Sequence, residues 1–223
     1  MSTPRRKFLS WLGASSALAA SASVFKSESL EAQPAQPAQA NKWDVSWTDR
    51  LKGKYKAVFD CPETGEGAAM FRACIWRDQH KEVYGTPQAE TSPVLVVRHA
   101  AMALIMDDEY WRRFGIGDAE KMIDPATDNG YAKNPIRAGD PKATGAFARY
   151  NLTDFMADGG IVLACNLAFR SVVSKYQRTD KLSAADARKV ALEHMVPGVI
   201  MQPSGIFAVL RAQEVGCNYV VAS

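Results

Sequence analysis

Short apolar runs alternate with longer amphipathic stretches along this chain from about residue 54 to its end. Residues 93–97 read Pro-Val-Leu-Val-Val, a continuous aliphatic run that is typical of a strand buried on both faces. Four other short runs also predict strands, and the stretches between them carry the apolar spacing of helices. The predicted strands are 54–59, 93–97, 161–164, 199–201 and 218–222. The predicted helices are 67–83, 100–106, 108–114, 144–157, 166–176, 183–195 and 205–215.

Strands that alternate with helices predict an α/β fold around a mostly parallel, doubly wound sheet of about five strands. Thr144, Ser183 and Ser204 stand where helix N-caps are expected, and Asp186 completes a capping-box-like pattern with Ser183. The segment 124–145 is crowded with Asp, Asn, Gly and Pro, which predicts an ordered insertion or a lid.

The N-terminus carries a predicted export signal. Arg5 and Arg6 are followed by Phe8 and Leu9 and then by an uncharged stretch rich in Ala, Ser and Leu, which is typical of twin-arginine export. The alternative is an ordinary secretory signal with two adjacent arginines. We therefore expect a periplasmic protein of the bacterial cell envelope, delivered already folded by the twin-arginine export machinery.

Small residues suited to signal cleavage define the expected domains. We expect a signal peptide over 1–22, with cleavage as late as residue 40 as an alternative. A linker or mature N-terminal segment follows over 23–50, and one globular domain occupies 51–223.

The predicted signal also accounts for the excess of basic over acidic residues in the chain. The sequence has 27 Lys and Arg against 24 Asp and Glu. Three of the basic residues fall within residues 1–22, which contain no acid, so the mature chain has 24 of each kind. A neutral mature chain gives no indication of a nucleic acid or anionic membrane partner. No stable membrane span is expected in the mature chain, because no second apolar stretch is long enough.

Cys165 is the strongest candidate for chemistry. It follows the predicted strand 161–164 and precedes a predicted helix. Reactive groups in a parallel sheet gather beyond the carboxyl ends of the strands, and a helix N-terminus stabilises a thiolate. The alternative is a small buried thiol that only packs well.

Three segments carry a resemblance to a known family. They are 159–169, which contains Cys165 followed by Asn166, then 199–205, which contains Pro-Ser-Gly at 203–205, and 213–220. The chain from 54 to 221 resembles the DsrE/DsrF-like family of sulfur-relay proteins. Cys217, the Ala after His99 and the segment 124–145 are departures from the family pattern.

The resemblance implies a flavodoxin-like three-layer sandwich and assembly into a homo-oligomer. It implies that Cys165 carries sulfur as a persulfide, exchanged with a sulfur donor or acceptor protein. Arg98, His99, Asn166 and Ser204 are candidate binding residues at the same edge. The function so predicted is periplasmic sulfur handling by a sulfur carrier or sulfurtransferase-like protein; the alternative is a non-catalytic binding or assembly module of the same family.

Cys61 also follows a predicted strand, the first one. First and third strands are neighbours in the flavodoxin order, so Cys61 and Cys165 would share an edge of adjacent strands. They would then act as resolving and attacking thiols or form a disulfide, if their Cα atoms lie within about 7 Å. The alternative is two unrelated thiols. Cys74 and Cys217 are interpreted as packing residues.

No cofactor and no metal are predicted. His99, Met102 and Met106 have helical spacing and soft donor atoms, but such a stripe is more often core. No glycine-rich phosphate loop occurs. Trp43, Trp47, Tyr131 and Ile136 are apolar residues that favour coverage by a second copy, in line with the expected homo-oligomer.

Overall fold

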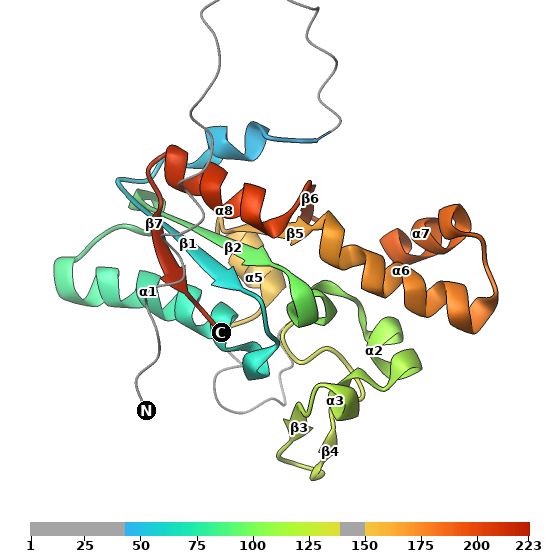
Figure 1. Cartoon of the computed structure of the whole chain (residues 1–223). Coiled ribbons are helices and arrows are strands. Elements are labelled where there is room, and N and C mark those ends of the chain that lie inside the picture. Colours follow the sequence, from blue (N-terminus) through green and yellow to red (C-terminus); the bar gives the residue numbers. More distant parts are fainter. Residues whose placement is uncertain (1–42, 139–149) are drawn as a thin grey trace, which may run out of the picture. The chain divides into compact units, whose positions relative to one another are not determined.

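Five parallel strands form the central sheet of the structure, a computed structural model that describes residues 43–138 and 150–223 (Figure 1). The strands are β1 (Tyr55–Cys61), β2 (Thr91–Val97), β5 (Ile161–Cys165), β6 (Ile200–Gln202) and β7 (Asn218–Val221). Their order across the sheet is β6-β5-β2-β1-β7. Every residue of β2, the middle strand, is buried, as the continuous aliphatic run predicts.

Helices connect the strands. The α-helices are α1 (Ala68–Tyr84), α2 (Asp108–Phe114), α3 (Ile116–Ala119), α5 (Leu152–Ala157), α6 (Asn166–Asp180), α7 (Ala184–Glu193) and α8 (Gly205–Glu214). Short 3-10 helices are η2 (Ser46–Arg50), η3 (Gly65–Gly67), η4 (Gln88–Glu90) and η5 (His99–Ile105). A small hairpin pairs β3 (Ile123–Asp124) with β4 (Asn129–Gly130).

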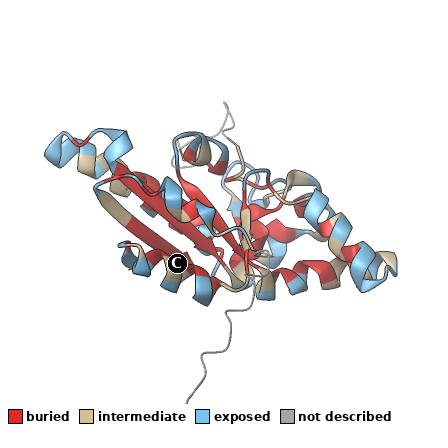
Figure 2. Cartoon of the chain, turned by 90° about the horizontal axis from the view of Figure 1, so that it is seen from above, coloured by how far each residue is buried: buried red, intermediate tan, exposed pale blue. Residues whose placement is uncertain are grey.

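Two apolar clusters lie on the two faces of the sheet, because successive residues of a strand point to opposite sides. Phe59, Leu95 and Val162 belong to one cluster, which includes residues of α1, η5 and α6. Val58 and Val96 belong to the other cluster, which includes residues of η2 and α8. The sheet therefore lies between two helical layers, and its strands are buried in Figure 2. The fold is an α/β, flavodoxin-like three-layer sandwich, as predicted.

The local signals for helix starts are confirmed in part. Ser183 accepts a hydrogen bond from the N–H of Asp186 at the start of α7, and Ser204 accepts one from the N–H of Phe207 at the start of α8. Within the described part of the predicted helix 144–157, α5 spans Leu152–Ala157, and Asn151 caps it by accepting a hydrogen bond from the N–H of Asp154. Thr144 lies outside the described residues.

The strand order differs from the flavodoxin order 2-1-3-4-5. Numbered along the chain, the five strands lie in the order 4-3-2-1-5, so β2 separates the first strand, β1, from the third, β5. The predicted adjacency of these two strands is therefore wrong. The strand order depends on which neighbour each connecting segment gives to the next strand, and the apolar pattern of the sequence does not specify that.

The segment 124–145 packs into the domain over its described part. Ile136 is fully buried, and the amide of Asn134 donates to the backbone oxygens of Leu104 and Met106, each at 2.7 Å. These bonds secure the segment against the end of η5. The part from 139 to 145 lies outside the described residues.

The domain begins before residue 51. Trp47 in η2 is fully buried in the core beside α8, and the compact unit spans 41–223. The chain thus covers Trp47 and Ile136 by itself, so these two residues give no support to a second copy. The export signal lies outside the described residues, and no helix within the described part has the length and hydropathy of a membrane span.

Candidate functional site

The carboxyl edge of the sheet gathers the side chains of interest, because all five strands run in the same direction. Asp60 and Cys61 end β1, Arg98 follows β2, and Cys165 ends β5. After β1 the chain adds β2, β5 and β6 on one side of it, and only then returns to add β7 on the other side. In open α/β sheets ligands bind outside the carboxyl ends of the strands at such a reversal, which here lies between β1 and β7.

Cys165 lies at the junction of β5 and α6, as the sequence predicts. It is extended, with φ −78° and ψ 110°, and is the N-cap residue of α6. Its sulfur accepts a hydrogen bond from the N–H of Ala168 at 3.4 Å. Only 6% of Cys165 is exposed. The sulfur therefore faces free N–H groups at the positive end of a helix of 15 residues, where negative charge is stabilised.

The other three cysteines are in surroundings that disfavour a thiolate. Burial raises the pKa of Cys61 to about 12, and it raises the pKa of Cys74 and of Cys217 to about 11. About one in 10,000 or fewer of these thiols is ionised at neutral pH, because each pKa unit is a factor of ten. All four cysteines are free thiols.

Cys61 does not lie beside Cys165. Across the sheet Cys61 is opposite Val97, and Val97 is opposite Ala164, the neighbour of Cys165. Two strand spacings give a Cα separation of roughly 10 Å, which exceeds the limit of about 7 Å for a disulfide. The Cys61 thiol instead donates to the backbone oxygen of Glu63 at 3.3 Å. In this fold Cys61 is therefore too far from Cys165 to act as its resolving thiol, and its raised pKa keeps it protonated.

A buried ion pair holds Arg98 at the same edge. Its Nε and Nη2 donate to the two carboxylate oxygens of Asp60 at 2.7 and 2.8 Å, and the Tyr219 hydroxyl donates to Oδ2 of Asp60 at 2.8 Å. Burial alone would raise the pKa of Asp60, but these hydrogen bonds outweigh it and the pKa is lowered. The same contacts raise the pKa of Arg98 and of Tyr219. Asp60 at the end of β1 and Tyr219 in β7 thus hold in place the guanidinium of Arg98, which follows β2.

Arg98 also reaches the start of α8 and the neighbourhood of Cys165. A Cβ atom on Gly205, the first residue of α8, would lie 2.6 Å from Cδ of Arg98, so only glycine leaves room for this side chain. The charge interaction with Cys165 is one of the causes that raise the pKa of Arg98. The carboxyl edge therefore combines a helix-capping thiol with a positively charged group fixed by Asp60.

His99 has an unusual backbone next to Arg98. Its φ is +49°, in the left-handed region that costs a residue with a Cβ roughly 1–2 kcal/mol. Its side chain is exposed, whereas Met102 and Met106 are buried in the core. The three residues of the predicted soft-ligand stripe therefore do not share a surface, and among the described residues no cluster of His, Cys, Asp and Glu could hold a metal.

The other two predicted binding residues have structural partners. Asn166 Oδ1 accepts a hydrogen bond from Nη2 of Arg188 at 2.7 Å, which joins α6 to α7. Ser204 caps α8, as described above. Both lie at helix starts on the carboxyl edge, but their polar side chains are already engaged.

Three residues of this edge were missed by the sequence analysis: Asp60, Tyr219 and Gln202. Gln202 is the direct strand partner of Cys165 and is fully buried; its Nε2 donates to the backbone oxygen of Asp44 at 2.6 Å. Its Oε1 has no hydrogen-bond partner within the described part of the chain, which is rare for a buried acceptor. A charged or amide residue at the end of an otherwise apolar run is the signal that could have identified Asp60 and Gln202.

Comparison with known proteins finds similarity in structure and none in sequence. No family profile and no curated protein matches the chain. A solved structure of a protein of unknown function, MTH1491 from Methanobacterium thermoautotrophicum, is similar with a TM-score of 0.40 and 12% identity. The match covers 75% of this chain and 98% of that chain.

Proposed function

We propose that this protein is a periplasmic sulfur carrier of the DsrE-like class, with Cys165 as the thiol that holds sulfur as a persulfide. The observation that carries the proposal is the contrast among the four cysteines. Cys165 accepts a backbone hydrogen bond at a helix N-terminus near Arg98, while burial keeps the other three protonated. Thiolates are the reactive form, and such positively polarised surroundings favour them.

The transfer step requires no cofactor. The Cys165 thiolate attacks the outer sulfur of a persulfide or polysulfide donor, a new S–S bond forms, and the donor's own S–S bond breaks. The donor leaves as a thiolate or a shortened polysulfide, so no net oxidation occurs. An acceptor thiolate then attacks the outer sulfur of the Cys165 persulfide and regenerates the Cys165 thiolate. Arg98 supports both steps by its positive charge near the exchanging sulfur atoms.

Sulfur uptake tests the proposal. After incubation with polysulfide and removal of excess reagent, the intact protein should gain about one sulfur atom (roughly 32 Da) by mass spectrometry. Cyanide should then release that sulfur as thiocyanate and restore the original mass. A protein that gains no sulfur under these conditions would refute the carrier function.

A second candidate function is a non-catalytic binding or assembly module. The small exposed fraction of Cys165, 6%, is the observation that favours it. An inert thiol would react with iodoacetamide only after unfolding. A carrier thiol would be alkylated in the folded protein near pH 6, well before Cys61, Cys74 and Cys217.

We also propose that Arg5 and Arg6 direct export by the twin-arginine route. Replacing both by lysine keeps the charge of the signal but removes the guanidinium pair. The double variant should accumulate in the cytoplasm as the uncleaved precursor, measured by cell fractionation and immunoblotting. Normal periplasmic accumulation of the variant would show that an ordinary secretory signal is at work.

A further inference from the structure

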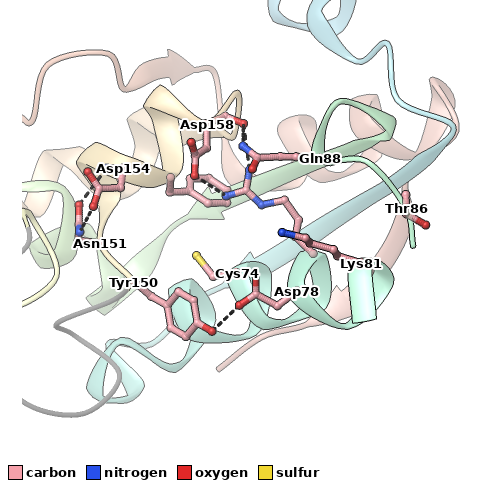
Figure 3. Close-up of a pocket in the computed structure, with 11 residues that line it drawn as sticks. Cys74, Asp78, Lys81, Thr86, Gln88, Tyr150, Asn151, Asp154 and Asp158 are labelled. Carbon is pink, nitrogen blue, oxygen red and sulfur yellow. Dashed lines mark hydrogen bonds and ion pairs between the residues drawn. The ribbon is translucent and has the colours of Figure 1, made fainter. Parts of the chain in front are cut away.

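A second candidate site lies at the opposite end of the sheet from Cys165. A cavity of about 180 Å³ separates α1 from the segment that includes α5 (Figure 3). Gln88, just before β2, and Asp158, just before β5, line it, so it opens at the amino ends of these strands. In Figure 3 Cys74 and Lys81 extend from α1 on one side, and Asp154 and Asp158 lie on the other.

Arg77 is the central group of this cavity. Its side chain is only 10% exposed, yet it makes one regular hydrogen bond, from Nη1 to the backbone oxygen of Asp158 at 3.0 Å. The Asp158 carboxylate is 3.7 Å from Nη2, beyond hydrogen-bond length. Arg77 also interacts with the Cys74 thiol, and this interaction lowers the pKa of the thiol, against the larger effect of burial, which raises it. A guanidinium has five N–H donors. Beyond these contacts the remaining N–H donors have no acceptor among the described residues, and Arg77 lines the cavity, so these donors are available to a ligand there.

The two walls differ in charge. The α1 wall carries Arg77, Lys81 and Asp78, whose carboxylate accepts a hydrogen bond from the Tyr150 hydroxyl at 2.6 Å, whereas the charged residues of the other wall are all acidic. Lys81 lies one helical turn after Arg77, so both cations belong to the α1 wall. Asp154 and Asp158 are four residues apart on the other wall. Asp154 accepts a hydrogen bond from the amide of Asn151 at 2.7 Å and forms no ion pair with any described residue.

Two less polar side chains, Phe155 and Cys74, also line the cavity. The centre of the Phe155 ring lies 5.3 Å from the Arg77 guanidinium carbon. The volume of about 180 Å³ corresponds to about six water molecules. That space suits a short aliphatic compound.

We propose that this cavity binds a small zwitterion that carries one carboxylate and one ammonium group on a short aliphatic chain. The carboxylate fits the free N–H groups of Arg77, whose planar fork matches carboxylate geometry, with Lys81 as a second cation. The ammonium group fits Asp154. A dicarboxylate would bring like charge to the acidic wall, and a diamine would bring like charge to Arg77. The site is independent of Cys165 and of its proposed sulfur chemistry.

Binding of matched four-carbon compounds tests the proposal. The probes are 4-aminobutyrate as zwitterion, succinate as dicarboxylate and 1,4-diaminobutane as diamine, with β-alanine as a shorter zwitterion. Amide chemical-shift titrations of the mature protein at pH 7 should give a dissociation constant of about 1 mM for at least one zwitterion. Succinate and the diamine should bind at least about tenfold more weakly, and the shifted amides should belong to α1 and α5.

Variants locate the site. Arg77→Gln should weaken zwitterion binding by about tenfold or more, and Lys81→Gln by about threefold; Lys81 is exposed, so this change is not expected to affect folding. Arg72→Gln, at an exposed position of α1 outside the cavity, and Cys165→Ser should both leave binding unchanged. Absence of binding by both zwitterions up to 20-fold above the expected constant would overturn the proposal, as would equal binding of succinate or the diamine. Persistence of full binding in both cavity variants would overturn it too.

Discussion

Replacing Cys165 by serine should abolish sulfur uptake from polysulfide. Serine keeps the size and the N-capping hydrogen bond to Ala168, so α6 and the fold are expected to persist. Its hydroxyl cannot form a persulfide. Intact-mass measurement should therefore show no addition of 32 Da, and cyanide treatment should release no thiocyanate above background.

The matched controls are Cys61→Ala and Cys217→Ala. Both remove buried thiols whose pKa is raised, and alanine is a small apolar replacement. The backbone oxygen of Glu63, which accepts from the Cys61 thiol, belongs to an exposed residue, so loss of this weak hydrogen bond is expected to cost little. Each variant should take up one sulfur atom, as the wild type does. If the Cys165 variant still gained sulfur, or if a control lost it, Cys165 would not be the carrier thiol.

Replacing Asp60 by asparagine should lower the free energy of unfolding by about 3 kcal/mol, measured by urea unfolding at pH 7. The change leaves the Arg98 charge without its carboxylate partner, and removing one member of a buried pair is strongly destabilising. The side chains of Arg98 and Asp60 are only 24% and 6% exposed.

The Arg137–Asp108 pair provides the control for this effect. It has the same two-pronged geometry, at 2.9 and 2.7 Å, but its side chains are 40% and 29% exposed. Asp108→Asn should therefore cost no more than about 1 kcal/mol. Equal losses for the two variants would show that burial does not set the strength of the Asp60 pair.

The same Asp60→Asn variant should change the response to acid. The pKa of Asp60 is lowered in the folded protein, so its carboxylate stabilises the fold fully above the unfolded pKa of about 4. This contribution is lost as the pH falls below that value and the carboxylate takes up a proton. Between pH 5 and pH 3 the wild type should therefore lose more stability than the variant. Parallel losses in both proteins would contradict the pairing.

Local patterns were sufficient to predict the five strands and two of the helix caps. A central parallel strand such as β2 is buried on both faces, and the aliphatic run 93–97 meets that requirement over most of the strand. Ser183 and Ser204 contact residues three positions further along, so their role is visible within a few residues of sequence.

Long-range relations were not predictable in the same way. Asp60 meets Arg98 and Tyr219, which are 38 and 159 residues away in the chain, and nothing near Asp60 indicates either partner. The position of Cys61 relative to Cys165 depends on the strand order, which follows from where the crossovers return. The cavity beside Arg77 likewise needs two distant helical segments to be placed side by side.

The pairing of β1 with β7 has a consequence for the order in which the sheet assembles. Ala222 donates its N–H to the backbone oxygen of Asp60, and the N–H of Glu63 donates to the hydroxyl of Ser223, 160 residues further along the chain. Until β7 is in place, β1 is paired only with β2, and Asp60 lacks the Tyr219 hydroxyl. Contacts between residues so far apart form late, because a long loop must close before they add any stability. Docking of β7 is therefore expected to be a late step of folding, and it completes the surroundings of the Asp60–Arg98 pair.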